Sequence, residues 1–216
     1  MSIDQWSKDV AARVAERIRA TRDAAGLTVP ELAQLCADRG LAIPRTTITN
    51  LETGRRTSVD LAEFLVIADA LGIPPISLLF PVGTAATVEA LPGRAVSTWE
   101  AVAWFTGETP SMEIPPAGSE RELLDTFRAH DESVAAAATS TALAKDRRRK
   151  AGTTLDPSRR ADLLAKAAGY EELAFDDCRD LRTFRDRMRA RGLTPPALPA
   201  ELAFVDQPED HSEIGE

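Results

Sequence analysis

Short polar side chains and arginines are concentrated between residues 45 and 56. On a helix, the outward positions of this stretch would be Arg45, Thr46, Thr47, Thr49 and Asn50, and Arg55 and Arg56 follow. Arginine can bind guanine through two hydrogen bonds, asparagine can bind adenine in the same way, and threonine can contact a base or a phosphate. The two following arginines suit phosphate contacts. These residue types predict a helix that reads base edges in the DNA major groove.

Two short helices joined by a turn would hold these side chains in place. Thr28 and Glu31 have the spacing of a capping box, so a first helix should begin at about Val29. A second helix should begin near Pro44, with Ile48 and Leu51 on its buried face. Gly54 suits the end of that helix, because glycine tolerates a left-handed backbone. We include Thr28 among the expected DNA-contacting residues.

Residues 10 to 80 resemble the Cro and phage-repressor (XRE) family of helix-turn-helix regulators, and most closely its actinobacterial members. The matching segments are Glu31-Leu32-Ala33, Thr46-Thr47-Ile48, Leu51-Glu52-Thr53-Gly54-Arg55-Arg56 and the helix Leu61 to Ile73. The resemblance implies a five-helix, lambda-repressor-like DNA-binding domain at residues 8–82. It also implies a sequence-specific transcriptional regulator, with repression as the expected effect. The turn at residues 37–43 is longer than is usual in the family.

Apolar side chains at helical spacing support this domain independently of the resemblance. They form one stripe before the motif and one after it: Val10, Val14 and Ile18, then Leu61, Phe64, Leu65, Ala68 and Leu71. Ile76, Leu79 and Phe80 predict a short last helix.

The distribution of charge matters more than the net charge of −8. Between residues 39 and 56 the charged residues are four arginines (Arg39, Arg45, Arg55 and Arg56) and a single glutamate, Glu52, which makes this stretch locally +3. Residues 196–216 carry acids without a lysine or arginine, and we expect an extended acidic tail there. The local field decides whether DNA is attracted, because screening limits its range.

The middle of the chain predicts a connecting segment at residues 83–118. Pro92-Gly93 indicates a turn, and a short helix that carries Trp99 and Trp104 should begin near Ser97. Three prolines between residues 109 and 118 indicate a linker.

Residues 119–195 predict a long antiparallel helical hairpin, which makes the expected fold class all-α. The second helix shows a heptad-like seam: Leu163, Ala167, Tyr170, Ala174, Asp177, Leu181, Phe184 and Met188. A single copy of the hairpin should leave Leu163, Leu181, Phe184 and Met188 only partly covered, so we expect a homodimer through residues 119–191. The basic run at residues 147–150 is either a second DNA contact or a solvated helix end.

Nothing in the sequence predicts catalysis, a metal site or a cofactor. The two histidines, His130 and His211, lack metal-ligand spacing, and there is no glycine-rich phosphate loop. Cys36 and Cys178 are expected to be reduced. The chain has no apolar run of bilayer-spanning length and no signal segment, so we expect a cytoplasmic protein.

Three functional hypotheses follow from these features. The first is a dimeric regulator that binds double-stranded DNA. The second is a protein-interaction module, such as an antitoxin or adaptor, whose helix-turn-helix serves autoregulation. The third is a ligand-sensing regulator with a pocket near Trp99 and Trp104.

Overall fold

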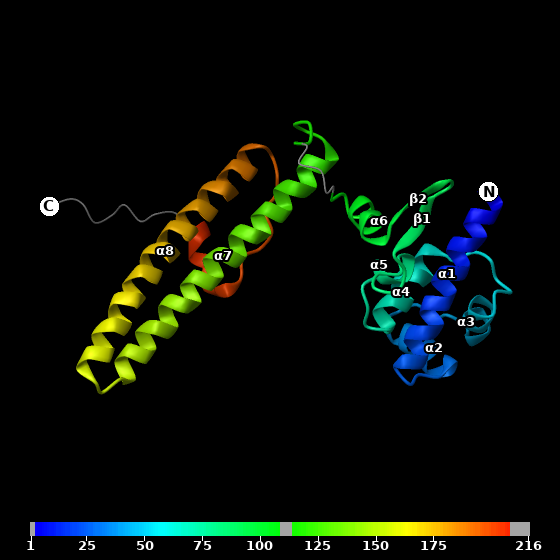
Figure 1. Cartoon of the computed structure of the whole chain (residues 1–216), viewed down its shortest axis with the longest axis horizontal. Coiled ribbons are helices and arrows are strands. Elements are labelled where there is room, and N and C mark those ends of the chain that lie inside the picture. Colours follow the sequence, from blue (N-terminus) through cyan, green and yellow to red (C-terminus); the bar gives the residue numbers. More distant parts are fainter. Residues whose placement is uncertain (1–2, 109–113, 208–216) are drawn as a thin grey trace. The chain divides into compact units, whose positions relative to one another are not determined.

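The computed structural model describes residues 3–108 and 114–207, and the chain divides into two compact units, residues 1–112 and 113–216 (Figure 1). Each unit is described by itself. None of the helices within the described ranges combines the length and the apolar character that crossing a membrane requires.

The first unit begins with five helices: α1 (Ile3–Ala24), α2 (Val29–Asp38), α3 (Arg45–Glu52), α4 (Leu61–Ala70) and α5 (Ile76–Leu79). Local signals define their ends. Asp60 caps α4 by accepting hydrogen bonds from two backbone N–H groups of its first turn, as expected for an N-cap aspartate. Gly54, which follows the C-cap residue Thr53, has a φ of +72°, so it terminates α3 as the sequence predicted.

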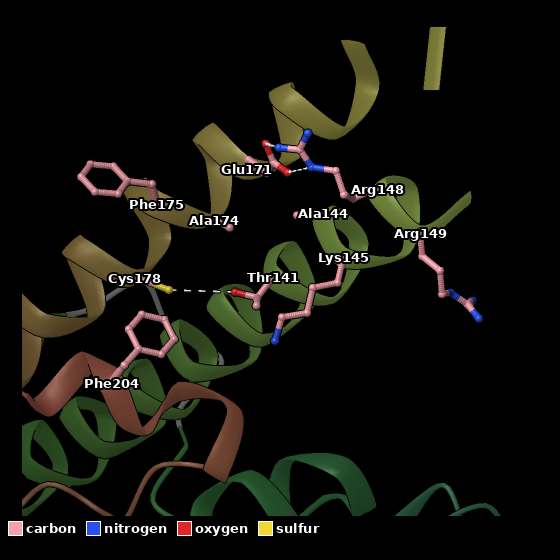
Figure 2. A pocket seen from close by; sticks show the side chains of 10 residues that line it. All are labelled: Thr141, Ala144, Lys145, Arg148, Arg149, Glu171, Ala174, Phe175, Cys178 and Phe204. Atoms are coloured by element: carbon pink, nitrogen blue, oxygen red, sulfur yellow. Dashed lines mark hydrogen bonds and ion pairs between the residues drawn. The ribbon is translucent and has the colours of Figure 1, made fainter. Parts of the chain in front are cut away.

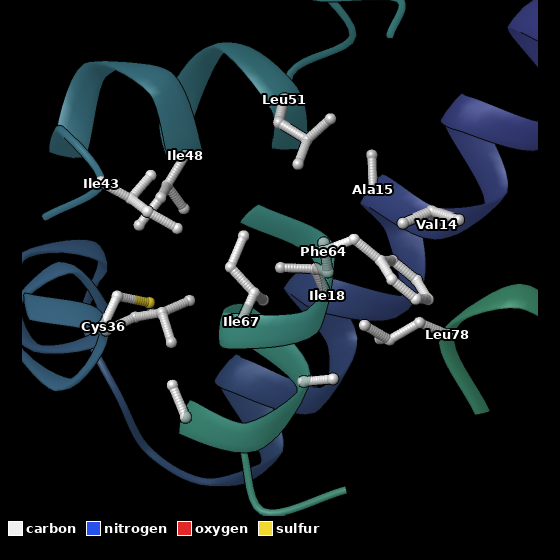
Figure 3. Packing of buried hydrophobic residues seen from close by; sticks show 13 residues of the cluster. Val14, Ala15, Ile18, Cys36, Ile43, Ile48, Leu51, Phe64, Ile67 and Leu78 are labelled. Atoms are coloured by element: carbon white, nitrogen blue, oxygen red, sulfur yellow. The ribbon is translucent and has the colours of Figure 1, made fainter. Parts of the chain in front are cut away.

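The core of this unit lies where α1 to α5 meet (Figure 3). Ile18, Leu32, Ile48, Ile67 and Leu78 are fully or almost fully buried, and each comes from a different helix. Because every helix contributes to one core, the position of α3 depends on all the others.

A two-stranded antiparallel sheet follows the five helices, and the all-α prediction missed it. Strands β1 (Thr87–Leu91) and β2 (Arg94–Ser97) pair across the turn at Pro92-Gly93. The strands are too short to show a clear alternation, and Val88 is buried by Phe80 and Ala101, which are distant in sequence. Helix α6 (Thr98–Phe105) then starts at a capping box formed by Ser97 and Glu100.

The second unit contains two helices of 34 residues each, α7 (Glu120–Thr153) and α8 (Pro157–Ala190), which lie side by side in Figure 1. Ser119 and Asp156 cap them, and Pro157 occupies the first turn of α8. The antiparallel helical hairpin was therefore predicted from sequence at nearly the observed bounds.

The seam of α8 faces α7 and η1 within the same chain. Leu181 and Met188 are fully buried without a second copy, so the expectation of partial cover is wrong for these two side chains, whereas Leu163 and Phe184 are half-buried as expected. The reason is the short 3-10 helix η1 (Ala200–Asp206), whose Leu202 and Val205 pack on Ala137 and Leu181.

Helix η1 also corrects the prediction of an extended tail at residues 196–216. Its two apolar side chains are buried, and its last residue, Asp206, forms ion pairs with Arg185 and Arg189. The remainder of the predicted tail, residues 208–216, lies outside the described residues.

Candidate nucleic-acid interface

The motif begins at the N-terminus of α2, where Thr28 and Glu31 form the predicted capping box. The Thr28 hydroxyl and backbone N–H both donate to the Glu31 carboxylate, at 2.7 Å each, and the hydroxyl oxygen accepts from the Glu31 backbone N–H. The hydrogen bond from the Thr28 hydroxyl lowers the pKa of Glu31. Thr28 was predicted to contact DNA, but in the structure its hydroxyl is engaged in this cap.

The turn at residues 37–43 is packed rather than loose. Gly40 has a φ of +92°, Leu41 donates its backbone N–H to Cys36, and Ile43 is buried in the core. The extra residues of this turn therefore fix the position at which α3 begins.

Helix α3 divides into a buried and an outward face. Ile48 and Leu51 are buried, whereas the outward face carries the predicted set: exposed Arg45, Thr46 and Thr49, with half-buried Thr47 and Asn50. The structure thus places all five predicted side chains of this helix on its polar side.

Hydrogen bonding separates these side chains into two kinds. The Thr49 hydroxyl donates to the Arg45 carbonyl oxygen at 2.9 Å, and the Thr53 hydroxyl donates to the Thr49 carbonyl oxygen at 2.7 Å. The side chains of Thr46, Thr47 and Asn50 form no hydrogen bond with another described residue. Their donors and acceptors are available to a ligand such as a base edge.

The arginines near α3 also differ in their partners. Arg56 forms an ion pair with Glu63 at 2.6 Å, and Arg39 forms one with Asp69. Glu63 and Asp69 lie outside residues 39–56, the stretch with a local charge of +3. Part of that positive charge is therefore neutralised by acids from another part of the sequence. Arg45 and Arg55 are exposed and form no ion pair within the described residues.

A buried ion pair that the sequence did not reveal attaches the end of α3 to α1. Arg22 donates from Nε and Nη2 to the two carboxylate oxygens of Glu52, at 2.8 Å each. Arg22 also donates to the Leu27 carbonyl oxygen at 2.7 Å. Arg22 and Glu52 are 30 residues apart in the sequence. Their pairing could be inferred only if the orientations of α1 and α3 were already known.

Three of the four residues in the basic run at the end of α7 have partners inside their own unit. Arg148 forms a two-bond ion pair with Glu171 of α8 at 2.8 and 2.9 Å. Arg149 and Lys150 both contact Asp146, one turn earlier on the same helix. These contacts favour the interpretation of a solvated helix end over that of a second DNA contact.

Neither Trp99 nor Trp104 lines the cavity that borders their helix, α6. Trp99 is 65% exposed, and the guanidinium of Arg94 lies over the Trp104 ring at 5.9 Å. A neighbouring cavity between α1 and α4 is lined by Phe105 from the same helix, α6.

Comparison with known families agrees with this geometry. Residues 13–78 match the family of helix-turn-helix domains, a range that contains α2, the turn and α3. No curated protein and no solved structure matches the chain. The first unit therefore contains a helix-turn-helix domain, which indicates a DNA-binding regulator.

Proposed function

We propose that the chain is a sequence-specific, DNA-binding transcriptional repressor of the Cro and phage-repressor type that acts as a homodimer. The observation that carries this proposal is the outward face of α3, where Thr46, Thr47 and Asn50 have no partner among the described residues while the opposite face is locked into the core. Polar groups held rigidly and left unpaired suit the reading of base edges.

In this proposal α3 lies in the major groove. Arg45, Thr47 and Asn50 contact base edges, and Thr46 and Thr49 contact bases or the adjoining backbone. Arg55, Arg56 and Thr28 contact phosphates, which fix the register of the domain without reading sequence. Arg55 carries most of this positioning, because Arg56 and Thr28 already have partners within the chain.

We place the dimer contact in residues 119–191, on the side of α8 that carries Leu173. This side chain is 47% exposed, and a second hairpin would remove it from water. Two domains joined in this way would meet half-sites about one helical turn apart, and the link would raise affinity through effective concentration.

Selection of bound sequences from a random duplex library tests the proposal. The wild-type chain should enrich a palindromic site, and Asn50→Ala should lose about 1–3 kcal/mol on that site and relax one base position. Gln34→Ala is the control, because the Gln34 amide already donates to Asp38 at 2.8 Å. An equal loss on every sequence would remove Asn50 from base recognition, and absence of any enriched site would refute the function.

A protein-interaction module, such as an antitoxin or adaptor, is the second candidate function. The exposed apolar side chains of the hairpin, such as Leu173 and Phe175, support this alternative. A different protein could cover them as well as a second copy of the chain could. Light scattering distinguishes the two. A purified chain that is dimeric by itself supports the repressor, whereas a monomer that forms a defined complex with the product of an adjacent reading frame supports the module.

A further inference from the structure

An apolar groove of about 630 Å³ runs between α7 and α8 beside η1 (Figure 2). It lies wholly within the second unit and is separate from α3. Its volume falls within the range of small-molecule sites, which are mostly apolar with a few polar groups at defined places.

Two small side chains open the groove. Ala144 of α7 and Ala174 of α8 line it between two contacts that join the helices, the ion pair of Arg148 with Glu171 on one side and the 4.0 Å contact of Thr141 with Cys178 on the other. These two contacts hold α7 and α8 together at both ends of a short stretch. Within that stretch the small alanine side chains leave the space between the helices unfilled.

Two aromatic side chains border the groove and remain exposed. Phe175 of α8 is 69% exposed and Phe204 of η1 is also exposed, although both line an apolar surface. Phe204 is held in place by its own helix, because Leu202 and Val205 are buried and Arg185 binds Asp206 through two hydrogen bonds of 2.7 and 2.8 Å. The groove is therefore a preformed surface.

The rim of the groove carries both paired and unpaired charges. Arg148 is neutralised by Glu171, and Arg149 by Asp146. Lys145 lines the same groove, is exposed, and forms no ion pair within the described residues. One unpaired ammonium group beside an apolar floor is complementary to a ligand with an apolar body and one negative charge.

We propose that this groove binds a small amphipathic carboxylate, whose apolar body lies on Ala144, Ala174, Phe175 and Phe204 and whose carboxylate pairs with Lys145. Residues from α7, α8 and η1 contribute to it. Leu173 itself does not line the groove, and it lies about 100° around the axis of α8 from Ala174 and about 200° from Phe175. The groove and the proposed dimer contact are therefore compatible.

Calorimetric titration of the full chain with decanoate below its micelle concentration tests the proposal, with decanol as the uncharged probe. Decanoate should bind saturably at one site per chain. Lys145→Gln should weaken decanoate binding about 3-fold to 5-fold without changing decanol binding, and Lys166→Gln on an exposed part of α8 should change neither.

A groove-filling variant gives the second arm. Ala174→Phe should weaken both probes at least about 10-fold, whereas Ala165→Phe on the exposed side of α8 should not; far-ultraviolet circular dichroism verifies that both variants fold. Absence of saturable binding, or equal binding by Ala174→Phe, would overturn the proposal. The proposal would also be overturned if light scattering showed that Ala174→Phe converts a dimer to a monomer. That result would mean that a second copy of the chain occupies the groove.

Discussion

Arg22 and Glu52 form a two-bond ion pair that joins the last turn of α1 to the last residue of α3. The two side chains are 9% and 6% exposed, and the hydrogen bond to Glu52 raises the pKa of Arg22. Since Arg22 also binds the Leu27 carbonyl oxygen, one guanidinium connects α1, the start of the helix-turn-helix and the end of α3. The orientation of the proposed recognition helix therefore depends on a residue that cannot contact a base.

We expect Arg22→Met to lower the free energy of unfolding of the first unit by about 3 kcal/mol, because it leaves a buried carboxylate without its partner. Urea unfolding followed by tryptophan fluorescence measures this selectively, since Trp6, Trp99 and Trp104 all lie in the first unit. Arg19→Met is the control: its ion pair with Asp23 is largely exposed and should contribute less than about 1 kcal/mol. Equal losses in both variants would mean that the buried pair does not stabilise the unit.

We expect Arg55→Gln to weaken binding to every duplex alike and to lower the slope of log affinity against log salt by roughly one unit, because one phosphate contact is lost. Fluorescence anisotropy on a selected site and on an unrelated duplex, at several salt concentrations, measures both effects. Arg179→Gln removes the same charge from the second unit and should leave the slope unchanged. A sequence-dependent loss in Arg55→Gln would instead assign Arg55 to base recognition.

The helix boundaries were predictable because their causes are local. Thr28 with Glu31, Asp60 before α4 and Gly54 after α3 act within four residues of themselves, so their effect is visible in the sequence. The outward face of α3 was predictable for the same reason. Once Ile48 and Leu51 are assigned to the core, the helical period determines the rest.

The features that sequence reasoning missed depend on contacts between distant residues. The β1–β2 hairpin is stabilised by burial of Val88 against Phe80 and Ala101, and its own strands carry little signal. Helix η1 lies in a stretch that looks like an acidic tail by composition. It is held by the burial of Leu202 and Val205 and by Arg185 of α8, which binds Asp206 and the Pro196 carbonyl oxygen. Such partners cannot be assigned before the hairpin register is known.

The ion pair between Arg185 and Asp206 predicts a pH dependence of the second unit. The hydrogen bonds from Arg185, with a smaller contribution from Arg189, lower the pKa of Asp206 to about 2. A carboxylate whose pKa is depressed by folding stabilises the folded state above its unfolded pKa of about 3.9, and this stability is lost as the pH falls to about 2. The shift corresponds to about 2 kcal/mol, which solvent screening of this partly exposed group reduces to about 1 kcal/mol.

We therefore expect Asp206→Asn to destabilise the second unit by about 1 kcal/mol at pH 7 and to match the wild-type chain near pH 2. The fluorescence of Tyr170, the single tyrosine of the chain, follows unfolding of this unit. Asp186→Asn is the control, because the ion pair of Asp186 with Arg189 is more exposed. A difference between Asp206→Asn and wild type that persisted unchanged at pH 2 would assign the effect to packing of η1 instead of charge.

The last prediction concerns the proposed dimer and its expected contribution to DNA binding. We expect Leu173→Lys to convert the dimer to a folded monomer, because it places a charge in the proposed contact, and to weaken operator binding by the loss of effective concentration. A chain that ends at Gly118 should behave in the same way, since the first unit has its own core. Leu155→Lys, in the exposed turn between α7 and α8, should change neither mass nor affinity. Light scattering and anisotropy measure the two properties, and a chain ending at Gly118 that remained dimeric would move the dimer contact into the first unit.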